Sequence, residues 1–246
     1  MGEILAGSPA RLHVGSYAIK ENMKSSTTNL KPTLDFLAKL NKNNNRDWFN
    51  AHRADYERAR EAFEIFVDAL IREHGKIEDL KGVAAKDCIF RIYRDVRFSK
   101  DKSPYKTHMA AAITPGGKQS GKLGYYLHVG PDNQSFIAGG LHMPDSKQLG
   151  KFRQAIARDA SKFKKVLAHK DFVKYLGTVG GDKLKTAPAG FARDHPDIEW
   201  LKLKQVLAGH QVPDKQVLAP SYVAYTVQVF KALKPFLDYL NSVLEG

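Results

Sequence analysis

Apolar residues recur at helical spacing near both ends of the chain, whereas apolar and polar residues alternate in its middle. A first helix is predicted over residues 33–40, with Thr33 as its cap. A long helix should follow from about residue 46 to His74 and end at Gly75. Its buried face consists of Phe49, Tyr56, Phe63, Val67, Leu70 and Ile71, and its solvent side carries Arg53, Arg58 and Arg60 among acids.

The middle of the chain predicts a three-stranded antiparallel meander over residues 107–113, 123–129 and 135–142, with turns at 115–117 and 130–133. Gly139 and Gly140 would let a ligand or another backbone approach the third strand closely. The preceding segment fits either a strand or a helix. We favour a strand over residues 87–93, followed by an irregular turn at Arg94 and Asp95.

The remainder of the chain has mostly helical spacing. Helices are predicted from 146 to about 166, over 171–176, over 197–207 and from 222 onward, with a long connection over 180–195 and a kink or restart at Pro235. The pattern as a whole predicts an α+β fold, in which a central antiparallel sheet is flanked by an N-terminal helical segment and a C-terminal helical half. Residues 1–30 are expected to be a poorly ordered extension, and residues 31–246 a single domain.

The net charge of +13 is concentrated in two segments. Residues 91–106 hold six cations and two acids, and residues 147–215 hold fifteen cations and seven acids. Such a distribution favours an anionic partner, either a small molecule or nucleic acid. A generally basic, soluble protein is the alternative.

Other features narrow the class of protein. The single cysteine, Cys88, excludes an intrachain disulfide and a cysteine-rich zinc site, which suits a cytoplasmic location, and we expect it to be buried. No apolar run approaches the roughly 18 residues that cross a bilayer, so no membrane partner is expected. Neither a glycine-rich phosphate loop nor a G-x-S-x-G motif is present, which argues against the familiar nucleotide and hydrolase classes.

The strongest candidate chemistry lies in residues 91–106, R-I-Y-R-D-V-R-F-S-K-D-K-S-P-Y-K. Arginine recognises phosphate and carboxylate through paired hydrogen bonds, and lysine adds a mobile point charge. The candidate anion-binding residues are Arg91, Arg94, Arg97, Lys102 and Lys106, and the candidate catalytic residues are Asp95, Asp101 and Tyr105. We expect the arginine side chains to converge on one binding site for a negatively charged ligand.

Three interpretations of this cluster stay open. It could be an enzyme site for a phosphorylated or carboxylated small molecule, which we favour. It could bind nucleic-acid phosphates, helped by lysines of residues 151–185 and by Tyr125 and Tyr126 as stacking surfaces. It could instead be a buried ion network that stabilises the fold. No particular cofactor, reaction or oligomeric state is indicated.

The histidines of the predicted meander form a second candidate. If the first turn is centred on residue 118, His108 faces His128, and a second turn centred on 132 places His128 opposite Phe136. His142 would then lie roughly 20 Å along the strand, which excludes a three-histidine metal site in this register. The pair His108 and His128 remains a possible acid–base or ligand pair, and no metal site is predicted.

The sequence of this cluster also resembles the signature of a known family. The pattern R-x-x-R-D-x-R-F-x-x-D-K-x-x-Y is filled by Arg91, Arg94, Asp95, Arg97, Phe98, Asp101, Lys102 and Tyr105. It resembles the signature of a family catalogued as domain of unknown function 2461, over about residue 33 to the C-terminus. The resemblance implies a soluble α+β domain found in bacteria and some fungi, and it supplies no activity, cofactor or catalytic residue.

Overall fold

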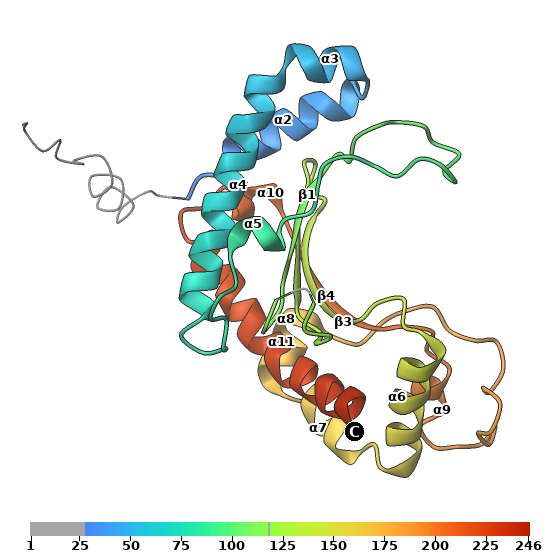
Figure 1. The fold of residues 1–246 in the computed structure, drawn as a ribbon. Coiled ribbons are helices and arrows are strands. Elements are labelled where there is room, and N and C mark those ends of the chain that lie inside the picture. Colours follow the sequence, from blue (N-terminus) through green and yellow to red (C-terminus); the bar gives the residue numbers. More distant parts are fainter. Residues whose placement is uncertain (1–27, 118) are drawn as a thin grey trace, which may run out of the picture.

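A four-stranded antiparallel sheet with strand order β1-β2-β3-β4 forms the centre of the fold (Figure 1). Its strands are β1 (Met109–Ile113), β2 (Tyr125–Val129), β3 (Ser135–Leu141) and β4 (Val206–Val212). The structure is a computed structural model, and it describes residues 28–117 and 119–246. The predicted α+β class is confirmed, since helices precede and follow an antiparallel meander.

The two faces of the sheet have different surroundings because side chains alternate along each strand. In β2, Tyr125, Leu127 and Val129 are buried, whereas Tyr126 and His128 are half-buried. The buried face packs against α4 (Arg53–His74), α5 (Ala85–Cys88) and α11 (Tyr222–Glu245), which lie together on one side of the sheet (Figure 1). We call the opposite face, which contains Tyr126 and His128, the open face.

Close packing between β3 and α11 depends on Gly139. A β-carbon at this position would lie 3.2 Å from Leu237 Cδ2, 3.3 Å from the Gly124 carbonyl oxygen and 3.4 Å from Leu233 Cδ2. The expectation that this glycine permits close approach is therefore confirmed, and the approaching groups are two leucine side chains of α11 and the Gly124 carbonyl oxygen. A kink or a restart was expected at Pro235, and α11 continues through that residue as one helix, so the restart is wrong and the kink stays a prediction.

The N-terminal helices are α2 (Lys31–Lys42), α3 (Arg46–Ala51) and α4, so the single helix predicted from 46 to 74 is wrong. The break falls at His52, whose ring stacks on that of Trp48 with the centroids 4.1 Å apart. The expected cap is also wrong, because Thr33 lies inside α2, where its buried hydroxyl donates to the Ala59 carbonyl oxygen at 2.8 Å.

The C-terminal half contains a strand that the sequence pattern did not predict. Its helices are α6 (Ser146–Arg158), α7 (Ser161–Leu167), α8 (Lys170–Leu176), α9 (Ile198–Leu201) and α10 (Asp214–Val217). The helix expected from 146 to 166 is two helices, and the helix expected over 197–207 ends at Leu201. β4 follows and pairs with β3 along its full length, which satisfies backbone groups that would otherwise form an open edge.

Two further expectations about the sheet need correction. The strand expected over 87–93 begins as helix α5, after which Ile89 and Tyr93 form isolated bridges with Ala111 and Tyr105. The register of β2 with β3 is confirmed, because His128 lies opposite Phe136. The register of β1 with β2 is wrong by two residues, because Ala110 rather than His108 lies opposite His128.

One continuous set of buried side chains includes residues from α2 to α11. The grouping of residues 31–246 into a single domain stays a prediction, which this continuous core favours. The expected N-terminal extension lies outside the described residues except for residues 28–30, of which Leu30 is buried in the core. Cys88 is buried, as expected. Among the described residues, no helix has the length and apolar character that crossing a membrane requires.

His74 is a titratable group inside this core. Its ring contacts Tyr125 and Phe230 edge-on, with centroids 4.6 and 5.2 Å away. Within the described part of the chain, neither of its ring nitrogens has a hydrogen-bond partner. Burial is the main cause that lowers the pKa of His74 to about 4, and nearby Lys234 acts in the same direction while Glu78 opposes it.

We expect Gly139→Ala to lower the free energy of unfolding by about 1–3 kcal/mol, because the added methyl group overpacks the contact with α11. Gly209→Ala is the matched control, since a β-carbon there would lie 3.6 Å or more from its neighbours. Chemical denaturation of both variants measures the difference. Equal stability of the two would contradict the packing described for β3 and α11.

A second prediction concerns pH. Between about pH 6.5 and 4 the unfolded chain takes up a proton at residue 74 that the folded protein does not, so stability should fall as the pH falls. The contribution of His74 is at most about 3 kcal/mol, and His74→Leu should flatten this part of the stability curve. Urea denaturation across this range is the measurement, and an unchanged curve in the variant would rule out a neutral buried imidazole.

Candidate functional site

Most of the signature residues lie in a loop, residues 94–104, that projects from the sheet (Figure 1). Its two ends pair like the neck of a hairpin. The Arg94 amide donates to the Pro104 carbonyl at 2.9 Å, the Lys106 amide donates to the Ile92 carbonyl at 2.8 Å, and Tyr93 bridges to Tyr105. This neck holds the loop in a defined position beside the sheet.

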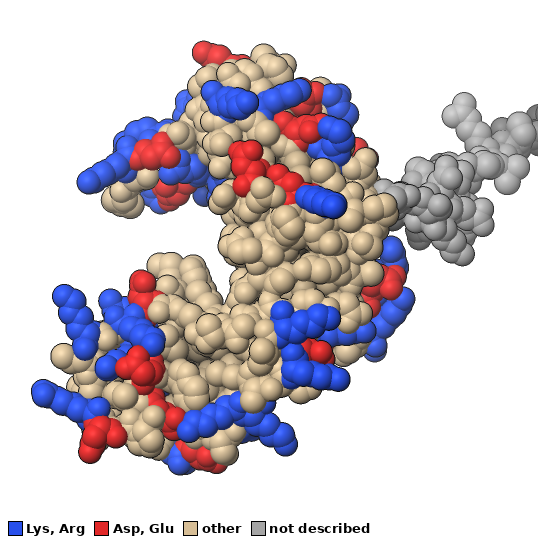
Figure 2. Space-filling model, turned by 180° about the vertical axis from the view of Figure 1, so that it is seen from behind, with Lys and Arg blue, Asp and Glu red and all other residues tan. Residues whose placement is uncertain are grey.

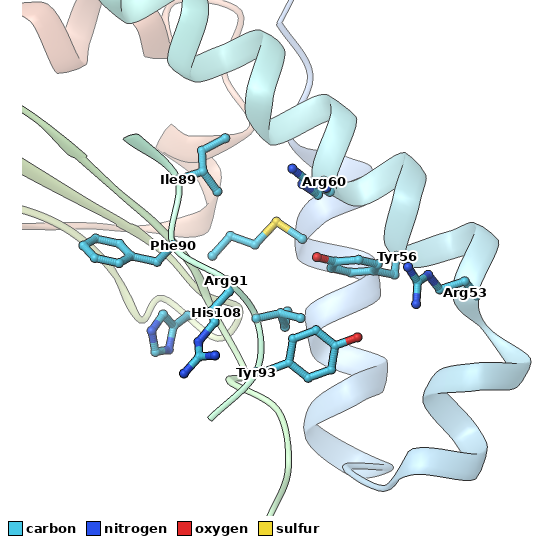
Figure 3. A pocket seen from close by; sticks show the side chains of 10 residues that line it. Arg53, Tyr56, Arg60, Ile89, Phe90, Arg91, Tyr93 and His108 are labelled. Atoms are coloured by element: carbon cyan, nitrogen blue, oxygen red, sulfur yellow. The ribbon is translucent and has the colours of Figure 1, made fainter. Parts of the chain in front are cut away.

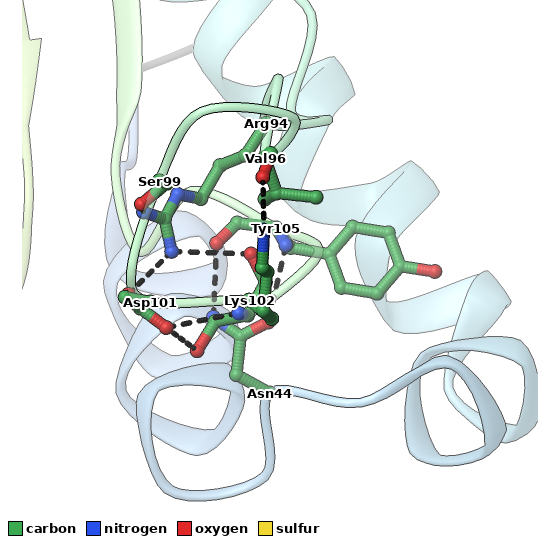
Figure 4. Close-up of polar contacts among 8 residues, drawn as sticks. Asn44, Arg94, Val96, Ser99, Asp101, Lys102 and Tyr105 are labelled. Carbon is green, nitrogen blue, oxygen red and sulfur yellow. Dashed lines mark hydrogen bonds and ion pairs between the residues drawn. The ribbon is translucent and has the colours of Figure 1, made fainter.

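Arg94 fills the inside of the loop (Figure 4). Its guanidinium donates to the Asp101 carboxylate, to the Ser103 carbonyl oxygen at 3.1 Å and to the Ser99 hydroxyl at 3.4 Å. Asp101 also accepts bonds from the hydroxyl and amide of Ser103, at 2.6 and 2.9 Å. These bonds from Ser103, followed by the one from Arg94, lower the pKa of Asp101 to about 2. Asp101 is therefore ionised at neutral pH and is a weak base.

The outer part of the loop is exposed. Arg97 forms a two-bond pair with Asp95, at 3.0 and 2.6 Å, which lowers the pKa of that carboxyl group. The Lys102 ammonium donates to the Val96 carbonyl oxygen at 3.0 Å. Phe98 is 95% exposed at the tip.

Tyr105 and Asn44 anchor the base of the loop to the N-terminal helices. The Asn44 side chain donates to the Tyr105 carbonyl oxygen at 2.9 Å and accepts from the Tyr105 amide at 3.1 Å (Figure 4). The ring of Tyr105 is buried and stacks on Phe49, with centroids 4.0 Å apart. Sequence reasoning did not identify Asn44, whose position between two helices carried no distinct signal.

The three signature arginines do not converge on one space. Arg94 and Arg97 are bonded to carboxylates of their own loop, and only Arg91 lines a pocket beside it. The expectation of convergence fails because Asp95 and Asp101 lie close enough in sequence to bind the neighbouring guanidinium groups. The Lys106 side chain is also bonded within the protein. Its ammonium donates to the Arg91 carbonyl oxygen at 3.0 Å and lies 5.6 Å from the Phe90 ring centroid.

The pocket beside the loop lies between α4 and the extended segment that follows α5, and its volume is about 300 Å³. It is lined by Arg53, Tyr56, Arg60, Ile89, Phe90, Arg91, Ile92, Tyr93, His108 and Met109. Arg53, Tyr56 and Arg60 come from α4, Tyr93 points toward them, and Arg91 lies beside His108 (Figure 3). None of these described lining residues is an acid, so the pocket is strongly cationic.

The cations of the pocket differ in how far they are neutralised. Arg53 pairs with Glu57 at 3.0 Å and lies 5.8 Å from the Tyr56 ring centroid. Arg60 and Arg91 form no ion pair with any residue in ranges 28–117 and 119–246. Burial raises the pKa of Tyr56, and the charge of Arg60 opposes it, so the phenol remains a hydrogen-bond donor at neutral pH.

The predicted histidine pair borders this pocket. The rings of His108 and His128 stack with centroids 4.0 Å apart, although the two residues are diagonal rather than opposite neighbours. The two-residue error in register left them on the same face because side chains alternate with a period of two. Burial lowers the pKa of both imidazoles to about 4, helped by the charge of Lys106 at His108, so both are neutral at pH 7.

Three lining residues were predicted only as parts of a helix. Arg53, Tyr56 and Arg60 lie at positions i, i+3 and i+7, which places them on one face of α4. Two arginines and a tyrosine on one helical face were the available signal. Sequence reasoning missed it because acids alternate with these arginines and indicated a solvated face.

Comparison with known protein families gives a match over most of the chain. The family described as "Conserved hypothetical protein (DUF2461)" matches residues 32–239. No curated protein and no solved structure matches the chain. Because the matched range covers most of the 246 residues and includes both the signature loop and the pocket, the chain belongs to the DUF2461 family.

Proposed function

We propose that this protein binds a small phosphorylated or carboxylated molecule in the pocket lined by Arg53, Arg60 and Arg91. The observation that carries the proposal is the absence of any acid among the described lining residues, although three arginines line the pocket. Guanidinium groups are the side chains best suited to phosphate and carboxylate oxygens. Arg53 is paired with Glu57, but Arg60 and Arg91 have no ion-pair partner among the described residues, and this unbalanced charge favours an anionic ligand.

The uncharged lining residues favour a ligand that has an organic body as well as an anionic group. Tyr56 and Tyr93 provide hydroxyl donors and ring faces, and Ile89, Ile92 and Met109 provide apolar contact. Ligand pockets in proteins commonly combine a mostly apolar wall with a few placed polar groups. A phosphorylated or carboxylated molecule with a small organic body fits the volume of about 300 Å³.

Catalysis at this site stays a hypothesis. Neutral His108 borders the pocket and could exchange a proton with a bound molecule, with His128 stacked behind it. The predicted catalytic residues Asp95, Asp101 and Tyr105 do not line this pocket, and the first two are bonded to arginines. For Arg94 and Asp101 the bonds within the loop favour the structural interpretation of the cluster.

Arg60→Gln should weaken anion binding by about tenfold or more, because a charge-assisted hydrogen bond contributes about 1.5–3 kcal/mol. The probes are inorganic phosphate, citrate, ribose 5-phosphate and adenosine monophosphate, measured by thermal shift and titration calorimetry. Arg72→Gln removes the same charge from the exposed side of α4, outside the pocket, and serves as the control. If no probe binds the unmodified protein, or if both variants bind it equally, the pocket assignment is wrong.

Arg94→Ala tests the structural role of the loop interior. Loss of its bonds to Asp101 and Ser103 should open residues 94–104 and speed chymotrypsin cleavage after exposed Phe98 by about tenfold. Arg97→Ala, which removes only an exposed pair, should have little effect. Phosphate or metabolite affinity should be retained in both variants. Unchanged cleavage combined with lost affinity would show that Arg94 binds the ligand instead.

A further inference from the structure

The open face of the sheet forms the floor of a large hollow. In Figure 1 the loop of residues 94–104 lies beyond one end of the sheet, and α6, α9 and the long segment before β4 lie beyond the other. Figure 2 shows the hollow between these two arms, with an uncharged floor and with Lys and Arg side chains along both arms. The floor of the hollow is therefore uncharged, whereas its two arms carry basic side chains.

The two arms hold about half of the net charge. Residues 94–104 carry a net charge of +2, residues 146–158 carry +4 and residues 177–205 carry +1, out of +13 for the whole chain. In the described ranges, Lys100 on the loop and Lys147, Lys185 and Lys204 on the other arm form no ion pair. No ion pair with a described residue compensates the charges of these lysines, which favours an anionic partner near the arms.

The floor carries an aromatic platform, which we define as Phe90, His108, Tyr126, His128 and Phe136. His128 stacks on both His108 and Phe136, with centroids 4.0 and 4.5 Å apart. Tyr126 lies 5.7 Å from Phe136 and 6.2 Å from Phe90, measured between ring centroids. Most neighbouring positions on this face are small, with Ala110, Ala112, Ala138 and Gly209, although Gln211 lies opposite Phe136. Small neighbours leave the rings standing above the sheet.

The platform is uncharged at neutral pH. Its two imidazoles have a pKa of about 4, and its other members are Phe and Tyr. Lys106 and Arg91 lie at its edge, where the Lys106 ammonium is near the Phe90 ring and Arg91 lies beside His108 (Figure 3). Neutral flat rings bordered by cations are suited to a partner that alternates planar groups with negative charges.

We propose that the open face binds single-stranded nucleic acid, with bases stacked on the aromatic platform and phosphates on the two basic arms. Proteins that bind single strands without sequence preference combine aromatic stacking surfaces with a cationic groove. A duplex keeps its bases inside and offers no ring faces to such a floor. Phe90 and His108 of the platform also line the pocket assigned to the small anion, whereas Tyr126, His128 and Phe136 do not, so variants of the last three residues test the platform separately.

The test is fluorescence anisotropy with labelled oligothymidylate and oligouridylate of about twelve nucleotides, compared with an abasic oligomer of the same length and charge. We expect binding that weakens steeply with added salt, and an affinity for the abasic oligomer lower by about tenfold or more. Comparison of the two base-containing probes distinguishes DNA from RNA. Equal affinity for the abasic oligomer, or no binding at low salt, would overturn the proposal.

Two variants locate the binding. The double variant Tyr126→Leu, Phe136→Leu keeps apolar side chains but removes their ring faces, and it should weaken oligothymidylate binding by about tenfold. Lys100→Glu on the loop should weaken it too, whereas Lys231→Glu on α11, on the far side of the sheet, should not. Titration with phosphate reports separately on the small-anion pocket. If the leucine variant binds normally, or if polyglutamate displaces the oligonucleotide as readily as unlabelled oligothymidylate, the partner is a different polyanion and the proposal fails.

Discussion

Burial of one face of the sheet against α4 and α11 is the constraint on which the other features depend. Gly139 lets α11 lie directly on β3, and the buried residues of the strands complete a core that is continuous with the helices. α4 packs at the β1 side of that core. The N-terminal part of α4 places Arg53 and Arg60 beside the segment that follows α5, and the pocket lies between them. The opposite face of the sheet is not covered by these helices and holds the aromatic platform.

The cations of the molecule serve different purposes according to their counter-charges. Arg94 is surrounded by acceptors from its own loop, so its hydrogen bonds stabilise a local shape. Arg97 is paired at the surface, where such a pair contributes little to stability. Arg60 and Arg91, among the described residues, lack an ion-pair partner and line a pocket without acids. The distinction between the structural arginines and those proposed to bind a ligand therefore rests on geometry rather than on the density of charge along the chain.

The central meander and the register of β2 with β3 could be predicted because turn residues and alternation are local signals. β4 could not, because Val206, Ala208 and Val212 alternate over a short stretch that helical spacing also fits, and only the edge of β3 decides between them. The signature loop was identified from its composition, but its ion pairs depend on side-chain directions that spacing does not supply. The pocket joins α4 to a segment some thirty residues later, a contact that only the tertiary fold creates.

The central claim is that anion recognition belongs to the arginines of the pocket rather than to those inside the signature loop. Nuclear magnetic resonance of the arginine side-chain Nε–Hε groups during titration with phosphate tests it most directly, since each guanidinium reports its own hydrogen bonds. The account predicts saturable shifts at Arg53, Arg60 and Arg91, with Arg94 and Arg97 unchanged. Shifts confined to Arg94 and Arg97 would contradict it.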